Sequence, residues 1–341
     1  MTRRPRRRGA GPPASKRRPA HFALAPAVLA AVAIAGGWLY LGPGPGAQGQ
    51  STDVVLPSGV GLSGIARTLA RAGVIRAPAG FMLAATVTGA ARRLKAGEYA
   101  FRSGESLAEV VSAIAGGEVV RRFVTVPEGF TSQAVVDVLR RADYLAGPAP
   151  VPAEGALLPD TYEVSRGETR IDVLNRMAEA RDRLLDRLWD DRAPDLPYQS
   201  KEQAVILASV VEKETSLAQE RPKIAAVFIN RLKKGMRLES DPTVIYGVSG
   251  GVPLGHGLRA SELAAPTPYN TYLVGGLPPT PIANPGRAAL VAALAPAQTG
   301  DLYFVADGTG GHVFSDTLEA HRRNVARWRA IERARREAPA A

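Results

Sequence analysis

Short β-rich runs alternate with amphipathic segments along most of the chain, and this pattern predicts an α+β protein. One arrangement recurs three times: a β-rich run, a glycine turn, and a segment with apolar residues at helical spacing. In the first copy Ile65, Leu69 and Ala72 recur at positions i, i+4 and i+7, as on one face of a helix. The three copies cover residues 54–72, 99–115 and 123–141.

Helices are expected to predominate in the second half of the chain. The segment 201–217 is the most informative, because its middle, residues 204–211, is nearly all apolar. A helix that is apolar all round is buried in a core. Further helices are expected at residues 172–188, 224–232 and 319–337, and a β-like run at 302–306 before an Asp-Gly turn.

Residues 21–41 contain no Asp, Glu, Lys or Arg. As a helix they would extend about 31 Å, which matches the hydrocarbon core of a bilayer. Eight basic side chains and no acid precede them in residues 1–20, so the positive-inside rule places the N-terminus in the cytoplasm. We therefore expect a single-pass protein of the cytoplasmic (inner) membrane, with residues 42–341 in the periplasm or outside the cell. A cleaved signal peptide and a buried soluble helix are the alternatives.

The net charge of +11 belongs mostly to this basic tail. Subtracting its eight basic side chains leaves +3 for the rest, so no nucleic-acid partner is expected. Contact of the tail with anionic lipid is the expected use of its charge. Cysteine is absent, which excludes disulfides and thiolate metal sites, and His256, His312 and His321 are scattered. We expect no metal and no cofactor.

Two glutamates follow the apolar middle of the segment 201–217. Glu212 and Glu214 are two positions apart, so about 200° separates them around a helix and only one can face a given cleft. An unpaired carboxyl group near an apolar core has a raised pKa, which a general acid needs near neutral pH. Glu214 has the more apolar helical neighbours and is the better candidate, with an ion pair to Arg221 as its structural alternative.

The loops at residues 240–247 and 267–272 are rich in Tyr, Asn, Thr and Asp. These side chains offer planar faces and hydrogen-bonding groups that suit a sugar polymer. Taken separately, they are more often turn formers or caps.

The order and spacing of six motifs resemble the YceG-like endolytic murein transglycosylases. The motifs occupy residues 207–215, 227–232, 241–247, 268–272, 276–279 and 303–308, and residues 154–162 match a further one. The resemblance implies one N-terminal membrane helix, a LysM-like subdomain, and a catalytic domain that cuts nascent peptidoglycan glycan strands internally. Peptidoglycan synthases are the protein partners that it implies.

The resemblance also implies roles for single residues. Glu214 matches the catalytic glutamate of the family. It would protonate the glycosidic oxygen between N-acetylmuramic acid and N-acetylglucosamine, and the cleaved strands would carry 1,6-anhydro ends. This cleavage would limit strand length. The side chains expected to line the substrate groove are Asn230, Asp241, Thr243, Tyr246, Tyr269, Asn270 and Tyr272.

Two other functions remain open. One is a membrane-tethered muramidase-type hydrolase, in which Asp241 or Glu239 supplies the second carboxylate that hydrolysis needs. The other is a peptidoglycan-binding scaffold without catalysis.

Composition sets the expected domain boundaries. Gly and Pro concentrate after the apolar segment and predict a linker. The first strand–glycine–helix units resemble LysM modules, which bind N-acetylated sugars of cell walls, with a generic packing domain as the alternative. The expected order is a basic tail (1–20), a transmembrane helix (21–41), a linker (42–52), a small LysM-like α/β subdomain (53–122), a larger α+β catalytic domain (123–332) and a C-terminal tail (333–341).

Overall fold

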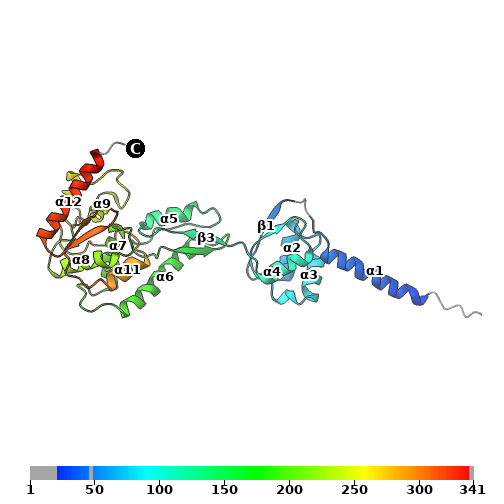
Figure 1. The fold of residues 1–341 in the computed structure, drawn as a ribbon. Coiled ribbons are helices and arrows are strands. Elements are labelled where there is room, and N and C mark those ends of the chain that lie inside the picture. Colours follow the sequence, from blue (N-terminus) through cyan, green and yellow to red (C-terminus); the bar gives the residue numbers. More distant parts are fainter. Residues whose placement is uncertain (1–20, 46–48, 338–341) are drawn as a thin grey trace, which may run out of the picture. The chain divides into compact units, whose positions relative to one another are not determined.

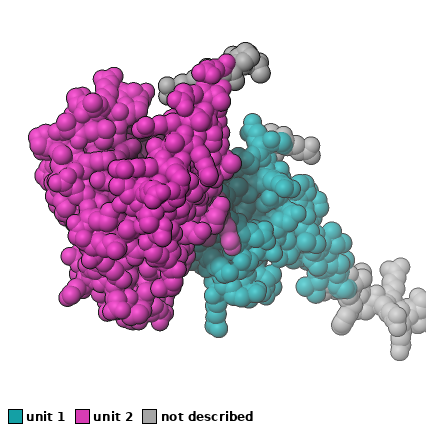
Figure 2. Space-filling model, turned by 60° about the vertical axis from the view of Figure 1, so that its left-hand side comes forward, with its two compact units in different colours: residues 1–120 teal, residues 121–341 magenta. Residues whose placement is uncertain are grey.

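The computed structural model describes residues 21–45 and 49–337. The predicted basic tail, residues 46–48 of the predicted linker and residues 338–341 lie outside this description. The chain divides into two compact units, with the division between Val120 and Arg121 (Figure 2). The sequence placed this boundary after residue 122. Each unit has its own apolar core and is described by itself.

Unit 1 is built on an antiparallel pair of strands, β1 (Ser51–Leu56; Figure 1) and β2 (Gly97–Arg102). Val54 of β1 lies opposite Tyr99 of β2. Val54, Leu56 and Tyr99 are buried, as expected for strands with one covered face. The remaining elements are α2 (Leu62–Arg71), α3 (Pro78–Val87), the 3-10 helix η1 (Ala90–Arg92) and α4 (Leu107–Gly116). Two of the predicted strand–glycine–helix repeats are therefore present, from β1 to α2 and from β2 to α4.

Helix α1 (His21–Leu41) has the bounds predicted for the membrane segment. Apolar side chains along it are exposed, Ile34 by 73% and Trp38 by 61%. The helix is rich in alanine and contains Pro26 and two glycines, which lower its hydropathy. Among the residues that the structure describes, no helix is long and apolar enough to cross a membrane. Membrane attachment therefore stays a prediction.

The segment after α1, which its Gly and Pro content predicted to be a linker, is hydrogen-bonded to other parts of unit 1. The Gly44 amide donates to the Gly104 carbonyl at 3.0 Å, and Arg76 Nη2 donates to the Pro43 carbonyl at 3.2 Å. A Cβ atom on Gly44 would lie 2.1 Å from the Glu105 carbonyl oxygen. Glycine at this position permits a close backbone contact rather than flexibility.

Unit 2 combines strand pairs with a helical core. Within the described residues β3 (Arg122–Thr125) pairs with β4 (Thr161–Val164), and β5 (Tyr303–Ala306) pairs with β6 (His312–Ser315), both antiparallel. The helices are α5 (Ser132–Arg141), α6 (Arg170–Asp190), α7 (Lys201–Glu214), α8 (Arg221–Lys233), α9 (Asp241–Ser249), α10 (Ala260–Leu263), α11 (Arg287–Leu294) and α12 (Leu318–Glu337). The third predicted repeat is the step from β3 to α5. The predicted α+β class is confirmed for the described part of the chain.

Helices α7, α8 and α11 pack around one apolar core in unit 2 (Figure 1). Leu207 and Val211 of α7, Phe228 of α8 and Leu290 of α11 are at most 1% exposed. Each such side chain contributes about 1.5–3 kcal/mol when it is fully buried. The prediction that the apolar middle of α7 lies in a core is confirmed, and α7 is a rigid base for the residues at its end.

Helix α7 is shorter than predicted at its C-terminal end. It begins after the N-cap Ser200, whose Oγ accepts the Gln203 amide at 3.3 Å. It ends at Glu214 rather than at residue 217, because Thr215 is extended with φ −141°. Thr215 Oγ1 accepts the Leu217 amide at 3.1 Å, a local bond that competes with helical hydrogen bonding. Glu214 is consequently the last helical residue.

Candidate active site

Glu212 and Glu214 contact different groups at the end of α7, which agrees with their spacing. Glu212 is 8% exposed, and its Oε1 lies 2.6 Å from Arg221 Nη2. Its Oε2 accepts the Gly286 amide at 2.9 Å. A further carboxylate, that of Glu128, lies 3.2 Å from Arg221 Nη1. The arginine proposed from sequence as the alternative partner of Glu214 therefore binds Glu212, which has a structural role.

Glu214 lies beside groups that act on its pKa in opposite directions. Burial raises the pKa of Glu214 to about 7, and the nearby Asp241 carboxylate acts in the same sense. The Ser240 hydroxyl, which donates to Glu214 Oε2 at 2.8 Å, opposes this rise, as do Arg231 and His312. The C-terminal end of a helix carries a partial negative charge, which also disfavours a carboxylate. Glu214 keeps partial solvent exposure. Its carboxyl group can therefore both donate and accept a proton near neutral pH.

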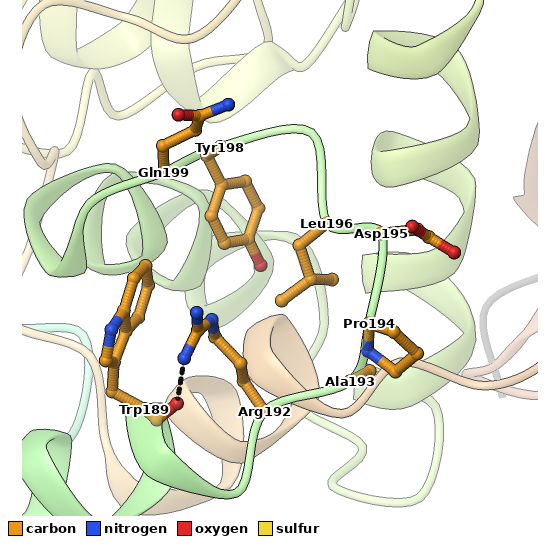
Figure 3. Close-up of a pocket in the computed structure, with 8 residues that line it drawn as sticks. All are labelled: Trp189, Arg192, Ala193, Pro194, Asp195, Leu196, Tyr198 and Gln199. Atoms are coloured by element: carbon orange, nitrogen blue, oxygen red, sulfur yellow. Dashed lines mark hydrogen bonds between the residues drawn. The ribbon is translucent and has the colours of Figure 1, made fainter.

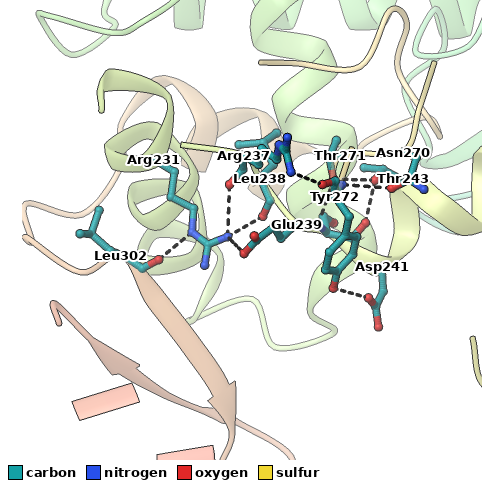
Figure 4. A network of polar contacts seen from close by, with 11 residues as sticks. Arg231, Arg237, Leu238, Glu239, Asp241, Thr243, Asn270, Thr271, Tyr272 and Leu302 are labelled. Carbon is teal, nitrogen blue, oxygen red and sulfur yellow. Dashed lines mark hydrogen bonds and ion pairs between the residues drawn. The ribbon is translucent and has the colours of Figure 1, made fainter. Parts of the chain in front are cut away.

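Arg231 anchors the turn at Leu238 and Glu239 (Figure 4), which leads into Ser240. Its Nε donates to the Leu302 carbonyl at 2.7 Å, and its Nη1 donates to the Leu238 carbonyl at 2.8 Å. Nη1 also lies 3.2 Å from Glu239 Oε2. Glu239 has φ 52°, a left-handed conformation that costs a non-glycine residue about 1–2 kcal/mol. Because this strained residue immediately precedes Ser240, the bonds of Arg231 hold the turn in place.

Asp241 and Tyr272 are predicted groove residues that lie near Glu214. Asp241 is exposed in the first turn of α9, and the Tyr272 hydroxyl donates to its Oδ1 at 2.7 Å (Figure 4). Burial raises the pKa of Tyr272, and the carboxylates of Asp241 and Glu214 raise it further. The Asp241 carboxylate raises the pKa of Glu214, and the Glu214 carboxylate raises the pKa of Tyr272, so both side chains belong to the environment of Glu214.

Two other predicted groove residues are used inside the protein. Thr243 and Asn270 are each 0% exposed. Thr243 Oγ1 donates to the Ser240 carbonyl at 2.6 Å and lies 2.8 Å from Thr271 Oγ1. Asn270 Nδ2 donates to the Leu263 carbonyl at 2.9 Å. Thr243 and Asn270 therefore support the loops around α9 from within and do not line a groove.

The remaining three predicted groove residues differ in availability. Asn230 Nδ2 donates to the carbonyls of Thr299 and Asp301 at 2.8 and 3.0 Å, so its amide nitrogen is used to hold that loop. The rings of Tyr246 and Tyr269 form an edge-to-face pair with centroids 4.9 Å apart, and both are half-buried. Contact of this tyrosine pair with a substrate stays a prediction.

Sequence reasoning missed Ser240 and the pair of Glu220 and His312. Ser240 precedes an Asp-Pro pair at the start of α9, a pattern that indicates a helix cap. Its side chain makes no cap bond and reaches Glu214 instead. His312 follows Glu220 by 92 residues in sequence, and only the fold brings the two together.

Glu220 and His312 connect the β5–β6 hairpin to the end of α7. Glu220 Oε2 lies 2.7 Å from His312 Nδ1, and the His312 amide donates to Glu220 Oε1 at 2.8 Å. Burial raises the pKa of Glu220, but the hydrogen bonds from His312 outweigh burial and the pKa is lowered. Thr215 Oγ1 donates to the same carboxylate at 3.3 Å. The residue that follows Glu214 is thereby fixed.

A separate surface hollow of about 490 Å³ lies between α6 and α7 (Figure 3). Trp189, Arg192 and Tyr198 contribute to its lining, and none of the predicted site residues does. Arg192 Cζ lies 4.3 Å from the centre of the Trp189 ring, and its Nη1 donates to the Trp189 carbonyl at 2.7 Å. Because the guanidinium covers one face of the ring, that face is not open for stacking on a sugar.

A half-buried glutamate with a pKa near neutrality, at the end of a buried helix in an α+β unit, defines a candidate acid–base site. The profile of the YceG-like family matches residues 54–327. The chain belongs to this family.

Individual proteins agree with this assignment. The endolytic murein transglycosylase of Bacillus subtilis (strain 168) is 30% identical over 306 residues, which cover 80% of this chain and 83% of the relative. The Streptococcus pneumoniae (strain D39) protein of the same name is 33% identical over 180 residues, 51% of this chain and 32% of the relative. A crystal structure of a yceG-like protein from Listeria monocytogenes superposes with a TM-score of 0.50 at 27% identity, over 80% of this chain and 98% of that one.

Replacing Glu214 by glutamine is expected to stabilise the fold at alkaline pH. The folded pKa of Glu214 lies above its ordinary value of 4.5, so the folded protein binds that proton more tightly than the unfolded chain does. The resulting stabilisation is complete below about pH 4.5 and is lost as the pH rises through about 7. Glu214→Gln is neutral at every pH and does not lose this stabilisation. Relative to the native chain, its free energy of unfolding should therefore rise by about 2 kcal/mol as the pH is raised from about 5 to about 8.

Glu212→Gln is the matched control in a urea-unfolding experiment. It leaves Arg221 buried without its nearest carboxylate, so it should lose about 3 kcal/mol at about pH 5. Because burial also raises the pKa of Glu212, this loss should become smaller, but not turn into a gain, at about pH 8. If Glu214→Gln loses as much stability at alkaline pH as this control, Glu214 is an ion-paired structural residue.

Proposed function

We propose that the chain is a lytic transglycosylase that cleaves peptidoglycan glycan strands internally. The B. subtilis and S. pneumoniae relatives are both named endolytic murein transglycosylase, and the first is matched over most of its length. The observation that carries the chemistry is the pKa of Glu214, which burial raises to about 7. At neutral pH both protonation states of this carboxyl group are populated, as one residue acting as acid and then as base requires.

Glu214 acts twice in the proposed reaction. Its protonated carboxyl group gives its proton to the glycosidic oxygen between N-acetylmuramic acid and N-acetylglucosamine as the bond from that oxygen to C1 breaks. The carboxylate then takes the proton of the muramyl C6 hydroxyl, whose oxygen forms a bond to C1 of the same ring. The products are a 1,6-anhydro end and a new free end on the N-acetylglucosamine side, without addition of water. Because the nucleophile is already part of the substrate, its correct placement replaces a second catalytic carboxylate.

Ser240, Arg231 and Asp241 prepare Glu214 for these two roles. The Ser240 hydroxyl fixes Oε2 of the carboxyl group and leaves Oε1 as the oxygen that can face the substrate. Burial raises the pKa of Glu214 most and Asp241 adds to the rise, while the Ser240 hydroxyl and Arg231 oppose it, so the pKa lies near neutrality. Tyr272 holds Asp241 through its hydroxyl group.

Hydrolysis with a second carboxylate is the other candidate function. Glu239 is paired with Arg231 at 3.2 Å, and no described contact joins it to Glu214. Asp241 is exposed, lies near Glu214, and is the candidate for this role. A muramidase that uses Asp241 would release reducing N-acetylmuramic acid ends.

Mass spectrometry of digested glycan strands separates the two reactions. We expect 1,6-anhydro ends from the native chain and no cleavage by Glu214→Gln, since that side chain cannot give up a proton. Asp241→Asn should still yield anhydro ends, with its optimum moved to lower pH because the carboxylate that raises the pKa of Glu214 is gone. Reducing ends in place of anhydro ends would contradict the transglycosylase, and cleavage by Glu214→Gln would assign the chemistry to another residue.

We also propose that α1 holds the chain at the cytoplasmic (inner) membrane, with residues 42–341 on the outer side. The support is a 21-residue helix without a charged side chain whose apolar residues are exposed. Unit 1, with its order of strand, two helices and strand, would act as a LysM-like glycan-binding module near that surface. Peptidoglycan synthases are the expected partners there.

Alkaline carbonate extraction of cell membranes tests this attachment. The full chain is expected to stay in the membrane pellet, because carbonate removes proteins that are held by charge alone. Full release into the supernatant would contradict an embedded α1.

A further inference from the structure

Helix α3 of unit 1 has an apolar outer face that no other described element covers. None of its ten residues is charged, although 22% of the chain is. Phe81 and Ala85 are 0% exposed and face the core. On the opposite side Leu83 is 67% exposed and Val87 is 77% exposed. An apolar face of this kind is expected to lie against another apolar phase.

The outer face of α3 continues into the C-terminal end of α1. A hollow of about 300 Å³ lies between the two helices, and its lining is almost wholly apolar. Leu39 and Tyr40 of α1, Leu83 and Val87 of α3, and Leu107 of α4 line it. The apolar surface of α1 and that of α3 therefore form one continuous surface within unit 1.

Hydrogen bonds hold the backbone that joins α1 to the rest of unit 1. The Gly44 amide donates to the Gly104 carbonyl, and the Gly104 amide donates back to the Pro45 carbonyl at 3.3 Å. Arg76 Nη2 clamps the preceding carbonyl, that of Pro43. The rest of unit 1 is therefore tied to the last turn of α1, and a bilayer that contains α1 would bring the outer face of α3 to its surface.

Basic side chains border this face on both sides in sequence. Arg76 precedes α3, and Arg92 and Arg93 follow it, all three exposed. Arg93 also shares a hollow with Tyr40 and Thr88, which places it next to the end of α1. Apolar residues bordered by arginines match the chemistry of a bilayer surface, where acyl chains lie beneath anionic headgroups.

We propose, on the basis of the membrane attachment put forward above, that the outer face of α3 inserts into the headgroup region of the bilayer. Unit 1 is then a second membrane contact, made by Leu83 and Val87 with Arg76, Arg92 and Arg93 at the phosphates. The contact fixes the orientation of unit 1 relative to the membrane surface.

Site-directed spin labelling tests this contact directly, because the chain contains no native cysteine. The full-length variants Leu83→Cys and Val87→Cys are labelled with a nitroxide and reconstituted into vesicles of phosphatidylcholine with a minority of phosphatidylglycerol. Collision rates with oxygen, which concentrates in lipid, are compared with those of a water-soluble nickel chelate. Val55→Cys, on the outer side of β1 and 38% exposed, is the matched control in unit 1, and Ile34→Cys reports α1 itself.

At positions 83 and 87 we expect oxygen collisions to exceed those of the nickel chelate, and the reverse at position 55. Equal, water-like behaviour at positions 55, 83 and 87 overturns the α3 contact. If position 34 reports lipid in that case, membrane attachment stands and only the α3 contact fails; if position 34 also reports water, both fail. Low collision rates with both reagents at positions 83 and 87 mean that protein, for example a second copy of the chain, covers this face, and they also overturn the proposal.

Discussion

The buried ion pair between Glu212 and Arg221 is the interaction on which the site depends. Its two atoms lie 2.6 Å apart, and the second oxygen of Glu212 accepts the Gly286 amide. These bonds join α7 to α8 and to the segment before α11, and they fix the rotation of the last turn of α7. Since residues two apart on a helix face different ways, fixing Glu212 also fixes the direction of Glu214. A buried charge that lost its partner would be strongly destabilising, so the pair tolerates little rearrangement.

Among the described residues, no arginine or lysine forms an ion pair with Glu214. Arg221 of α8 is taken by Glu212, and Arg231 of the same helix is committed to backbone carbonyls and to Glu239. The carboxyl group therefore receives a hydroxyl bond from Ser240 but no direct counterion. Burial then dominates and the pKa rises to about 7. Burial raises the pKa of Glu212 as well, against the Gly286 amide and Arg221, so what marks Glu212 as the structural glutamate is its ion pair with Arg221.

Local patterns predicted the elements but only part of the site. The apolar run in α7 indicated a buried helix, and the spacing of Glu212 and Glu214 showed that they would face apart. The choice of Glu214 followed from its apolar helical neighbours, yet Glu212 is the more enclosed side chain, because Gly286 and Arg221 cover it from other elements. Contacts of this kind come from other elements and leave no local periodicity in the sequence.

Polar loop residues were the least predictable. Thr243 and Asn270 have the side chains of a sugar-binding groove, but the same hydrogen-bonding groups hold the loops together from inside. Ser240 had the signature of a helix cap and instead contacts Glu214. The glycine and proline of the segment before Gln50 indicated a linker, and within it Gly44 allows a close contact with Glu105. In each case a residue type has two uses, and only its tertiary partner selects between them.

The pH dependence of glycan cleavage by the native chain and by Ser240→Ala tests the central claim most directly. The first step needs protonated Glu214, so kcat/KM of the native chain should fall as the pH rises through about 7. Removal of the Ser240 hydroxyl takes away a hydrogen bond that favours the carboxylate, so the pKa of Glu214 should rise and this fall should move to higher pH. A fall that stays at the same pH in Ser240→Ala would show that the titrating group is not Glu214.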